Sequence, residues 1–333
     1  MIYLDNNSTT QVDKRVLNKM LPYFSIKYIN PHSQKTRHSL GVIEDIEKSR
    51  EEIANLIGAN KEEVIFTSGA TESNNLAIKG MMLKIRRGKN HFISLNTEHK
   101  CVLEALRKIE LEGAKVTILK VKKDGLINLL DLKKAISKKT VMVSVMMANN
   151  ETGVIQPIEE IGNICKKNNI LLHTDAAQAV GKININVKKM NIDLMSISSH
   201  KFYGPKGIGA LYVRGKPRIR LNSLIDGGGQ EMNLRSGTLP VPLCIGFGEA
   251  AKISRKNFKK EFDKTKTLRN LFLSKIKEYF PDVKVNGSLK SRLPANLNIS
   301  IKGVNSQTLI SNLKYTVISS GSACSSRDLE PSY

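Results

Sequence analysis

The chain has 333 residues, of which 40% are hydrophobic and 25% charged, so it can form one large and one smaller domain around a sizeable core. Lysine and arginine number 53 against 30 acidic residues, which gives a net charge of +23, but tryptophan is absent and aromatic residues make up only 5%. The basic residues are spread along the chain without a base-stacking platform, so we expect no specific nucleic-acid partner. No apolar run approaches the roughly 18 residues of a membrane span, so we expect no membrane protein.

The predicted elements alternate between amphipathic helices and apolar strands. Val42, Ile46, Ile53 and Leu56 approximate one helical face, and strands are predicted at 64–67, 91–95, 116–119, 141–146, 170–175, 193–198 and 208–213. This order predicts an α/β fold with a mostly parallel sheet covered by helices on both faces. In such sheets ligands bind beyond the carboxyl ends of the strands.

The last third of the chain has a different pattern. A long Lys-rich helix is predicted over 241–280, followed by strands near 283–285 and 296–301, a helix near 306–313 and a strand near 317. We expect a large domain at 13–246 and a smaller α+β domain formed by 1–12 and 247–333.

The four cysteines, Cys101, Cys165, Cys244 and Cys324, are dispersed, and no two form a CxxC pair. This usage indicates a reducing compartment. We interpret Cys165 and Cys244 as packing residues and give Cys101 a structural role by default. The first residues show neither a basic lead nor an apolar stretch, so we expect a cytoplasmic protein, or a mitochondrial-matrix protein if a transit peptide was removed.

Three expected strand ends carry polar groups. Residues 68–74 open a helix with a Gly followed by small residues, which favours a phosphate, although a plain N-cap at Ser68 or Thr71 fits equally well. Asp175 could hold the protonated ring nitrogen of a pyridine cofactor, or serve as a turn residue. Lys201 has hydroxyl and imidazole neighbours that suit a lysine bound to a cofactor, whereas a solvated surface lysine is the default.

Cys324 lies in a run of small residues, 318–326, after a predicted strand. Such a setting favours exposure and movement, which a nucleophilic thiol requires. An incidental loop cysteine is the alternative, since no base motif is adjacent.

Taken in order, these stretches resemble the cysteine desulfurases of the NifS/IscS type, a branch of the class V aminotransferases among the fold-type I enzymes that use pyridoxal 5'-phosphate (PLP). The matching stretches are 3–10, 66–75, 97–100, 149–153, 173–178, 198–201, 227–231, 235–238 and 320–324. The Gly-Ser-Ala-Cys loop and residues 329–333 are most similar to the housekeeping branch of iron–sulfur assembly.

The resemblance implies a role for each matching residue. Lys201 would form the internal aldimine with PLP and later move the substrate's α-proton, Asp175 would pair with the ring nitrogen, and Gln178 with the ring oxygen. The remaining implied cofactor contacts are His99, which would stack on the ring and shuttle protons, Ala70, Thr71, Ser198 and His200 at the phosphate, Asn150 in the pocket, and Thr238 at the phosphate of the neighbouring subunit.

The resemblance also implies the reaction and its partners. Cys324 would take the sulfur of L-cysteine as a persulfide and release L-alanine, and it is the only residue proposed for a metal role, as a transient iron–sulfur ligand. The expected partners are a second copy of the chain, an iron–sulfur scaffold protein and sulfur carriers, including those for tRNA thiolation. Selenocysteine lysis, another PLP-dependent β-elimination, and a low-activity assembly partner are the alternatives.

The family's sequences continue beyond the segment that matches 329–333, with the rest of the small domain and a Ser-x-Arg-x-Ser segment whose arginine holds the substrate carboxylate. No residue of this sequence can be assigned that role. From the sequence we therefore expect PLP binding with weak cysteine binding and low turnover, and Arg235 is the first alternative carboxylate partner to consider.

Overall fold

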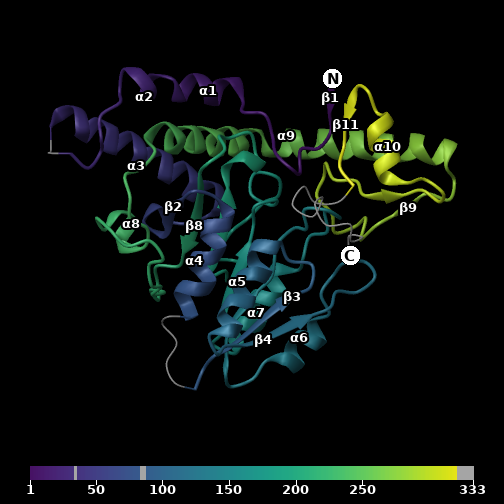
Figure 1. Ribbon diagram of the computed structural model, residues 1–333, viewed down its shortest axis with the longest axis horizontal. Helices are drawn as coiled ribbons and strands as arrows, with labels where there is room; N and C mark the ends of the chain where they lie inside the picture. The colour runs from purple at the N-terminus through teal and green to yellow at the C-terminus, as the bar shows by residue number, and fades with distance from the viewer. Residues whose placement is uncertain (34–35, 83–87, 321–333) are drawn as a thin grey trace.

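The computed structural model describes residues 1–33, 36–82 and 88–320, and its centre is a seven-stranded sheet (Figure 1). The strand order is β2-β8-β7-β6-β5-β3-β4. Only β8 runs antiparallel to its neighbours, so the predicted mostly parallel sheet is confirmed. The strands are β2 (Val64–Thr67), β3 (His91–Leu95), β4 (Lys115–Leu119), β5 (Thr140–Ser144), β6 (Leu171–Asp175), β7 (Leu194–Ser198) and β8 (Gly209–Val213).

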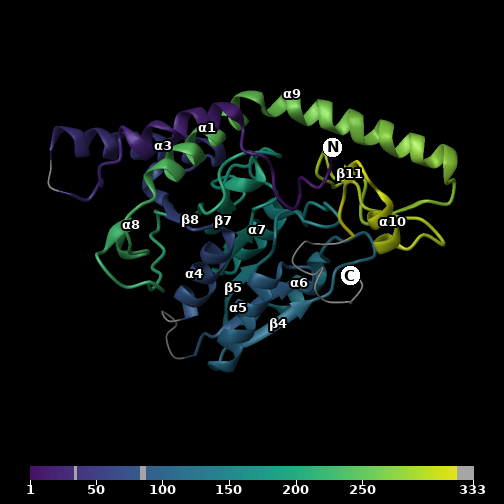
Figure 2. The same cartoon turned by 45° about the horizontal axis from the view of Figure 1, so that its top comes forward.

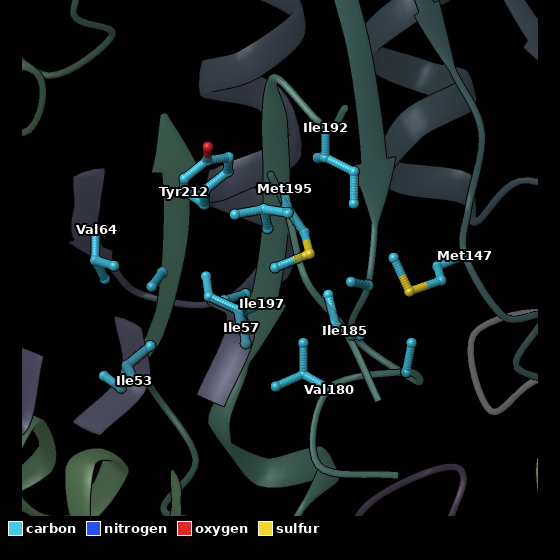
Figure 3. Packing of buried hydrophobic residues seen from close by; sticks show 14 of the residues in the cluster. Ile53, Ile57, Val64, Met147, Val180, Ile185, Ile192, Met195, Ile197 and Tyr212 are labelled. Carbon is cyan, nitrogen blue, oxygen red and sulfur yellow. The ribbon is translucent and has the colours of Figure 1, made fainter. Parts of the chain in front are cut away.

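Helices cover both faces of this sheet, and the alternation of side chains along each strand divides the core in two. In β8, Tyr212 belongs to the larger apolar cluster, whereas Leu211 belongs to the smaller one. The larger cluster includes α3 (Arg37–Ile57), α7 (Ile158–Lys167) and the first part of α9 (Val241–Tyr279), and the smaller one includes α4 (Ala70–Met82) and α5 (Lys100–Leu111). Figure 3 shows part of the larger cluster, in which Met195 and Ile197 of β7 and Ile57 of α3 take part.

The shorter elements lie around this core. They are α1 (Lys14–Met20), α2 (Pro22–Ser25), η1 (Lys61–Glu63), α6 (Leu129–Ala135), η2 (Ser199–Lys201) and α8 (Gln230–Asn233). The predicted packing roles of Cys165 and Cys244 are confirmed, since both side chains are fully buried in the larger cluster.

Helix α9 runs from the sheet to the C-terminal elements, and it confirms the long helix predicted over 241–280 (Figure 2). Those elements are β9 (Lys284–Val285), β10 (Ile299–Ser300), α10 (Ser306–Asn312) and β11 (Thr316–Val317). The strand predicted over 296–301 is wrong in length, because only Ile299 and Ser300 pair with β9.

The N-terminus lies beside the C-terminal elements. Strand β1 (Ile2–Tyr3) pairs in parallel with β11, with Ile2 opposite Thr316. Helix α9 crosses the expected boundary between residues 246 and 247 without interruption, so the division into two domains stays a prediction. Within the described ranges, no helix combines the length and the apolar character that crossing a bilayer requires.

Candidate active site

The expected polar residues gather at one edge of the sheet. Strands β2, β3, β6 and β7 all run in the same direction, because β2 and β7 flank the antiparallel β8. The chain segments that follow their carboxyl ends therefore meet at the same edge. These segments carry Ser68 to Thr71, His99, Asp175 to Gln178, and His200 with Lys201.

The turn between β2 and α4 has the features of an anion cradle. Gly69 has φ +154° and lies against β8, where a Cβ on Gly209 would come within 2.7 Å of the Gly69 Cα. Helix α4 then starts at Ala70, so its first N–H groups have no partner within the helix and carry the positive end of its dipole. Thr71 is exposed in this first turn. An anion would be favoured at this place.

The carboxylate of Asp175 is buried and fixed through both oxygens. Oδ1 accepts a hydrogen bond of 2.9 Å from the Ala177 N–H, and Oδ2 accepts one of 2.7 Å from the side-chain amide of Asn74. Asp175 is 5% exposed. Each oxygen can still accept a further hydrogen bond. Asp175 can therefore fix the turn after β6 and also bind the ring nitrogen of a pyridine cofactor.

Lys201 ends η2, directly after β7, and its ammonium group lies under the N-terminal segment. Nζ donates to the backbone carbonyl oxygens of Asn7 and Ser8, each at 2.7 Å. Gln178 Nε2 donates to the same Asn7 oxygen at 2.6 Å. The side chain is half-buried, so the default of a solvated surface lysine does not describe it.

The N-terminal segment also fixes His200. Thr9 Oγ1 lies 2.9 Å from His200 Nδ1, and the N–H and hydroxyl of Thr10 both donate to the His200 carbonyl oxygen at 3.0 Å. Burial, together with the nearby charge of Lys201, lowers the pKa of His200 to about 4. The imidazole is therefore neutral at physiological pH.

His99 lies at the N-cap of α5, where its Nδ1 accepts the Cys101 N–H at 3.2 Å. The Cys101 Sγ is 3.0 Å from the same nitrogen, and Asn74 Nδ2 donates to this sulfur at 3.1 Å. Burial raises the pKa of Cys101 to about 12, so the thiol keeps its proton. Burial also lowers the pKa of His99, which favours its neutral form. Hydrogen bonds therefore link Asp175 through Asn74 and Cys101 to a neutral His99.

Glu98 adds a buried carboxyl group next to this network. Its Oε1 accepts the Met146 N–H at 2.6 Å, whereas its Oε2 has no partner among the described residues. Burial raises the pKa of Glu98 well above its usual range, with a smaller contribution from the charge of Asp175. The raised pKa favours the protonated, uncharged form of Glu98.

Asn150 borders the same region, and its backbone carbonyl accepts a 3.1 Å hydrogen bond from Asn7 Nδ2. Thr238, in contrast, is exposed, and it lies at the end of the segment 227–238. Arg235 in this segment pairs with Glu72 of α4, with Nε 3.0 Å from Oε1.

A strained turn within that segment is anchored by a buried ion pair. Glu231, Met232 and Asn233 have φ values of 46°, 59° and 63°, a left-handed conformation that costs energy in residues other than glycine. Glu231 accepts hydrogen bonds of 2.6 and 2.8 Å from Arg50, and a third of 2.6 Å from the Phe66 N–H. The ion pair connects the segment that carries Thr238 to helix α3, and the bond from the Phe66 N–H connects it to strand β2.

Cys324 and the whole Gly-Ser-Ala-Cys loop lie outside the described residues. The preceding strand β11 is fixed beside the N-terminal segment, because Leu4 N–H donates to Val317 O at 3.0 Å and Ser319 Oγ donates to Asp5 Oδ1 at 2.9 Å. No cluster of three or more His, Cys, Asp or Glu side chains suited to a metal occurs in the described ranges.

Sequence reasoning missed several residues of this region, namely Asn7, Ser8, Thr9, Asn74, Glu98, Cys101 and Lys182. Residues 7–9 and 74 belong to stretches that carried the family resemblance, and this was the available signal. No pattern in the sequence indicates that Asn7 would lie over Lys201, 194 positions away.

Comparisons with known proteins agree on one family. Residues 2–332 match the aminotransferase class-V family. The chain is 53% identical to a cysteine desulfurase IscS of Rickettsia typhi over 334 residues, spanning all of this chain and 81% of the relative. It is 52% identical to a mitosomal cysteine desulfurase of Trachipleistophora hominis, spanning all of this chain and 77% of that protein. A solved structure described as SspA in complex with cysteine aligns with a TM-score of 0.87 and 38% identity, over 100% of this chain and 92% of that chain.

Proposed function

The chain belongs to the class V aminotransferase family, as a cysteine desulfurase, and we propose how its residues hold PLP and remove the sulfur of L-cysteine. The observation that carries the proposal is the convergence of Lys201, Asp175 and Gln178 at the carboxyl ends of adjacent strands β6 and β7. An amine, a fixed carboxylate and an oriented amide are the groups that a phosphorylated pyridine aldehyde requires.

The residues present fit this cofactor. The turn at Gly69 and the start of α4 suit its phosphate, with Ala70, Thr71, Ser198 and His200 around it. Asp175 would face the ring nitrogen, Gln178 the ring oxygen, and His99 the ring face. When bound, PLP delocalises the negative charge that develops at the α-carbon of the amino acid.

Lys201 is the covalent anchor for the cofactor and the base that moves the substrate's α-proton. The Asn7 and Ser8 carbonyl oxygens hold its Nζ at a defined place beside Gln178. His99 is neutral and accepts at Nδ1, so its Nε2 carries the proton and is available as a donor. Hydrogen bonds from Asn74 and from the Ala177 N–H fix the Asp175 carboxylate, so that it could meet the ring nitrogen in one orientation.

The sulfur acceptor is Cys324. The Cβ–S bond of cysteine would break with its electron pair left on Cβ, which takes up a proton to give L-alanine, while the sulfur forms an S–S bond with the Cys324 thiolate to give a persulfide. The fixed pairing of β11 with β1 supports this assignment, because it holds the chain that leads to residue 324 beside the segment over Lys201. The persulfide would pass to an iron–sulfur scaffold protein or to a sulfur carrier.

The active form is a homodimer in which Thr238 reaches the phosphate site of the neighbouring subunit. Two ion pairs support this, because Arg50–Glu231 and Glu72–Arg235 hold the segment 227–238 against α3 and α4, and α4 begins at this subunit's own phosphate site. We propose a reducing compartment, the cytoplasm or, if a transit peptide was removed, the mitochondrial matrix, in keeping with the free thiols of the described residues.

Product analysis tests this proposal. Purified protein with PLP and L-cysteine should release alanine and, with a thiol reductant, sulfide in equal amounts. Cys324→Ser should keep bound PLP and stop releasing sulfide. Lys201→Ala should release neither alanine nor sulfide. Pyruvate and ammonia in place of alanine would indicate β-elimination and would overturn the desulfurase assignment.

A further inference from the structure

The chain between β1 and α1 crosses the candidate site without forming a helix or a strand. Residues 4–13 lie in turns and loops, and residues 5–9 are half-buried. One end of this N-terminal segment pairs with β11, and near the other end the Thr10 N–H donates to the His200 carbonyl oxygen at 3.0 Å. The middle of the segment, which lies over Lys201, depends on side-chain contacts for its place.

Asn7 fastens this middle part to a rigid turn. Its side-chain Nδ2 donates a 3.1 Å hydrogen bond to the backbone oxygen of Asn150, 143 positions away. The turn around Asn150 is fixed by Asn149, whose Oδ1 accepts the N–H groups of Glu151 and Thr152 at 3.0 and 2.8 Å. The bond to this turn therefore defines where the Asn7 backbone lies.

The backbone oxygen of Asn7 accepts hydrogen bonds from two of the proposed cofactor residues. Gln178 Nε2 donates to it at 2.6 Å and Lys201 Nζ at 2.7 Å, which uses both of its lone pairs. Lys201 Nζ also donates to Ser8 O at 2.7 Å. A neutral amine has two hydrogens and an ammonium group has three, so both bonds can form in either protonation state. The place of Nζ therefore follows the Asn7 and Ser8 carbonyls.

The same oxygen defines how the Gln178 amide is turned. A carbonyl can only accept, so the atom that faces Asn7 O must be the amide nitrogen. At the other end of the amide, Oε1 accepts a 2.8 Å hydrogen bond from Lys182 Nζ, which needs no charge on Lys182 because a neutral amine also donates. One amide hydrogen is used on Asn7 O, so the second is available for the ring oxygen of the cofactor.

We propose that Asn7 is a positioning residue for Gln178 and Lys201: its side chain fastens the N-terminal segment to the Asn150 carbonyl, and its own carbonyl oxygen then holds the Gln178 amide and the Lys201 amine. This inference rests on the proposed function, in which Lys201 anchors PLP and Gln178 meets the ring oxygen. Asn7 acts through these two residues rather than on the cofactor itself.

The first test uses protein without PLP and follows the Ser8 carbonyl by NMR. Ser8-Thr9 is the only Ser-Thr pair in the sequence, so protein that is isotope-labelled at serine carbonyl carbons and threonine nitrogens gives one signal that correlates the two nuclei. Lys201→Met removes the donor to this carbonyl and should displace the signal. Asn7→Leu keeps a side chain of similar size without a donor. In the Asn7→Leu background, Lys201→Met should no longer displace the signal, because the contact is already lost.

Asn6→Leu is the matched control. Asn6 Nδ2 donates within the same segment, to Tyr3 O at 3.3 Å, so in this background Lys201→Met should displace the signal as far as in the unchanged protein. An equal displacement in the Asn7→Leu and Asn6→Leu backgrounds would overturn the inference, and so would no displacement in the unchanged protein. If Asn7→Leu does not fold by circular dichroism, Asn7→Ala removes the same donor with less bulk.

The absorbance of bound PLP provides the second test. A hydrogen bond to the ring oxygen favours the form of the cofactor in which no proton neutralises the charge of that oxygen. Asn7→Leu frees the Gln178 amide and weakens this bond, so the pH midpoint of the absorbance change should rise by about half a pH unit. Asn6→Leu should leave the midpoint unchanged, and an unchanged midpoint in Asn7→Leu would contradict the role of Asn7 toward Gln178.

Failure of the proposed function can be told apart from failure of this inference. If Lys201 does not anchor PLP, borohydride would fix the cofactor to another lysine in the unchanged protein. The Ser8 signal is measured without PLP, so it reports the role of Asn7 in either case.

Discussion

The side-chain amide of Asn74 donates a 2.7 Å hydrogen bond to the buried carboxylate of Asp175, across 101 positions of the sequence. The same nitrogen donates to Cys101 Sγ at 3.1 Å, and that thiol contacts His99 Nδ1. Asn74 thus links Asp175, the proposed partner of the PLP ring nitrogen, through the Cys101 thiol to His99, which we propose stacks on the ring.

Replacing Asn74 should weaken PLP binding. In Asn74→Leu the Asp175 carboxylate loses a charge-assisted hydrogen bond, which typically contributes about 1.5–3 kcal/mol. We expect the dissociation constant for PLP, measured by fluorescence titration of the PLP-free protein, to rise at least about tenfold. The control is Asn163→Leu on the exposed face of α7, which should leave the constant unchanged. Equal constants for Asn74→Leu and the control would exclude this role for Asn74.

The described cysteines should resist alkylation in the folded protein. Burial raises the pKa of Cys101 and of Cys165 to about 12, and it also raises the pKa of Cys244, so few thiolates form at pH 8. Iodoacetamide at pH 8 should therefore label Cys324 first, and labelling of the other three should require denaturant. Peptide mass spectrometry over time would measure this order, and fast labelling of Cys101 in the folded protein would argue against its role as a protonated donor to His99.

Acid should destabilise the fold through His173. This imidazole is fully buried between Ser144 and Ser196, and burial lowers its pKa to about 3, from about 6.5 in the unfolded chain. Between these two values the unfolded chain binds more protons, so the stability that this group contributes is present above pH 6.5 and is lost as the pH falls toward 3. The contribution to the free energy of unfolding should fall by about 1.4 kcal/mol per pH unit in that window.

Urea unfolding at pH 7.0, 6.0 and 5.0 would measure this slope. His173→Asn should be less stable at pH 7 but should lose stability less steeply as the pH falls. Parallel slopes for the variant and the unchanged protein would show that another group causes the acid sensitivity.

The ion pair between Arg50 and Glu231 should be essential for stability. The two side chains are 8% and 3% exposed, so Glu231→Ala would leave a buried guanidinium without its carboxylate, at a cost of about 3–5 kcal/mol. Glu47 also pairs with Arg50 but is more exposed, so Glu47→Gln should cost less than about 1 kcal/mol. Urea unfolding at pH 7 would compare them, and equal losses would contradict the dominant role of Glu231.

The proposed homodimer, in which Thr238 completes the phosphate site of the neighbouring subunit, predicts that PLP retention depends on assembly. Dilution to concentrations at which light scattering detects monomer should release PLP, and Thr238→Ala should weaken PLP binding without changing the dimer content. A monomer that retains PLP fully would contradict the shared site.

The strands and the edge where the polar residues gather could be predicted from the sequence, because strand periodicity and strand ends are local features. Lys201 and Asp175 are examples, since each follows an apolar run that was recognised as a strand. The contacts of Asn74, Lys182 and Asn7 could not be predicted, because they depend on side chains that meet only after the sheet has formed. The length of β10 could not be predicted either. Its partner β9 has only two residues, so only Ile299 and Ser300 of the apolar run at 296–301 are paired.

The central claim is that Lys201 is the covalent anchor of PLP. Borohydride reduction of the PLP-loaded protein, followed by digestion and peptide mass spectrometry, tests it most directly. We predict one modified lysine per chain, at Lys201. An adduct at any other lysine, with Lys201 unmodified, would contradict the role of Lys201 as the anchor.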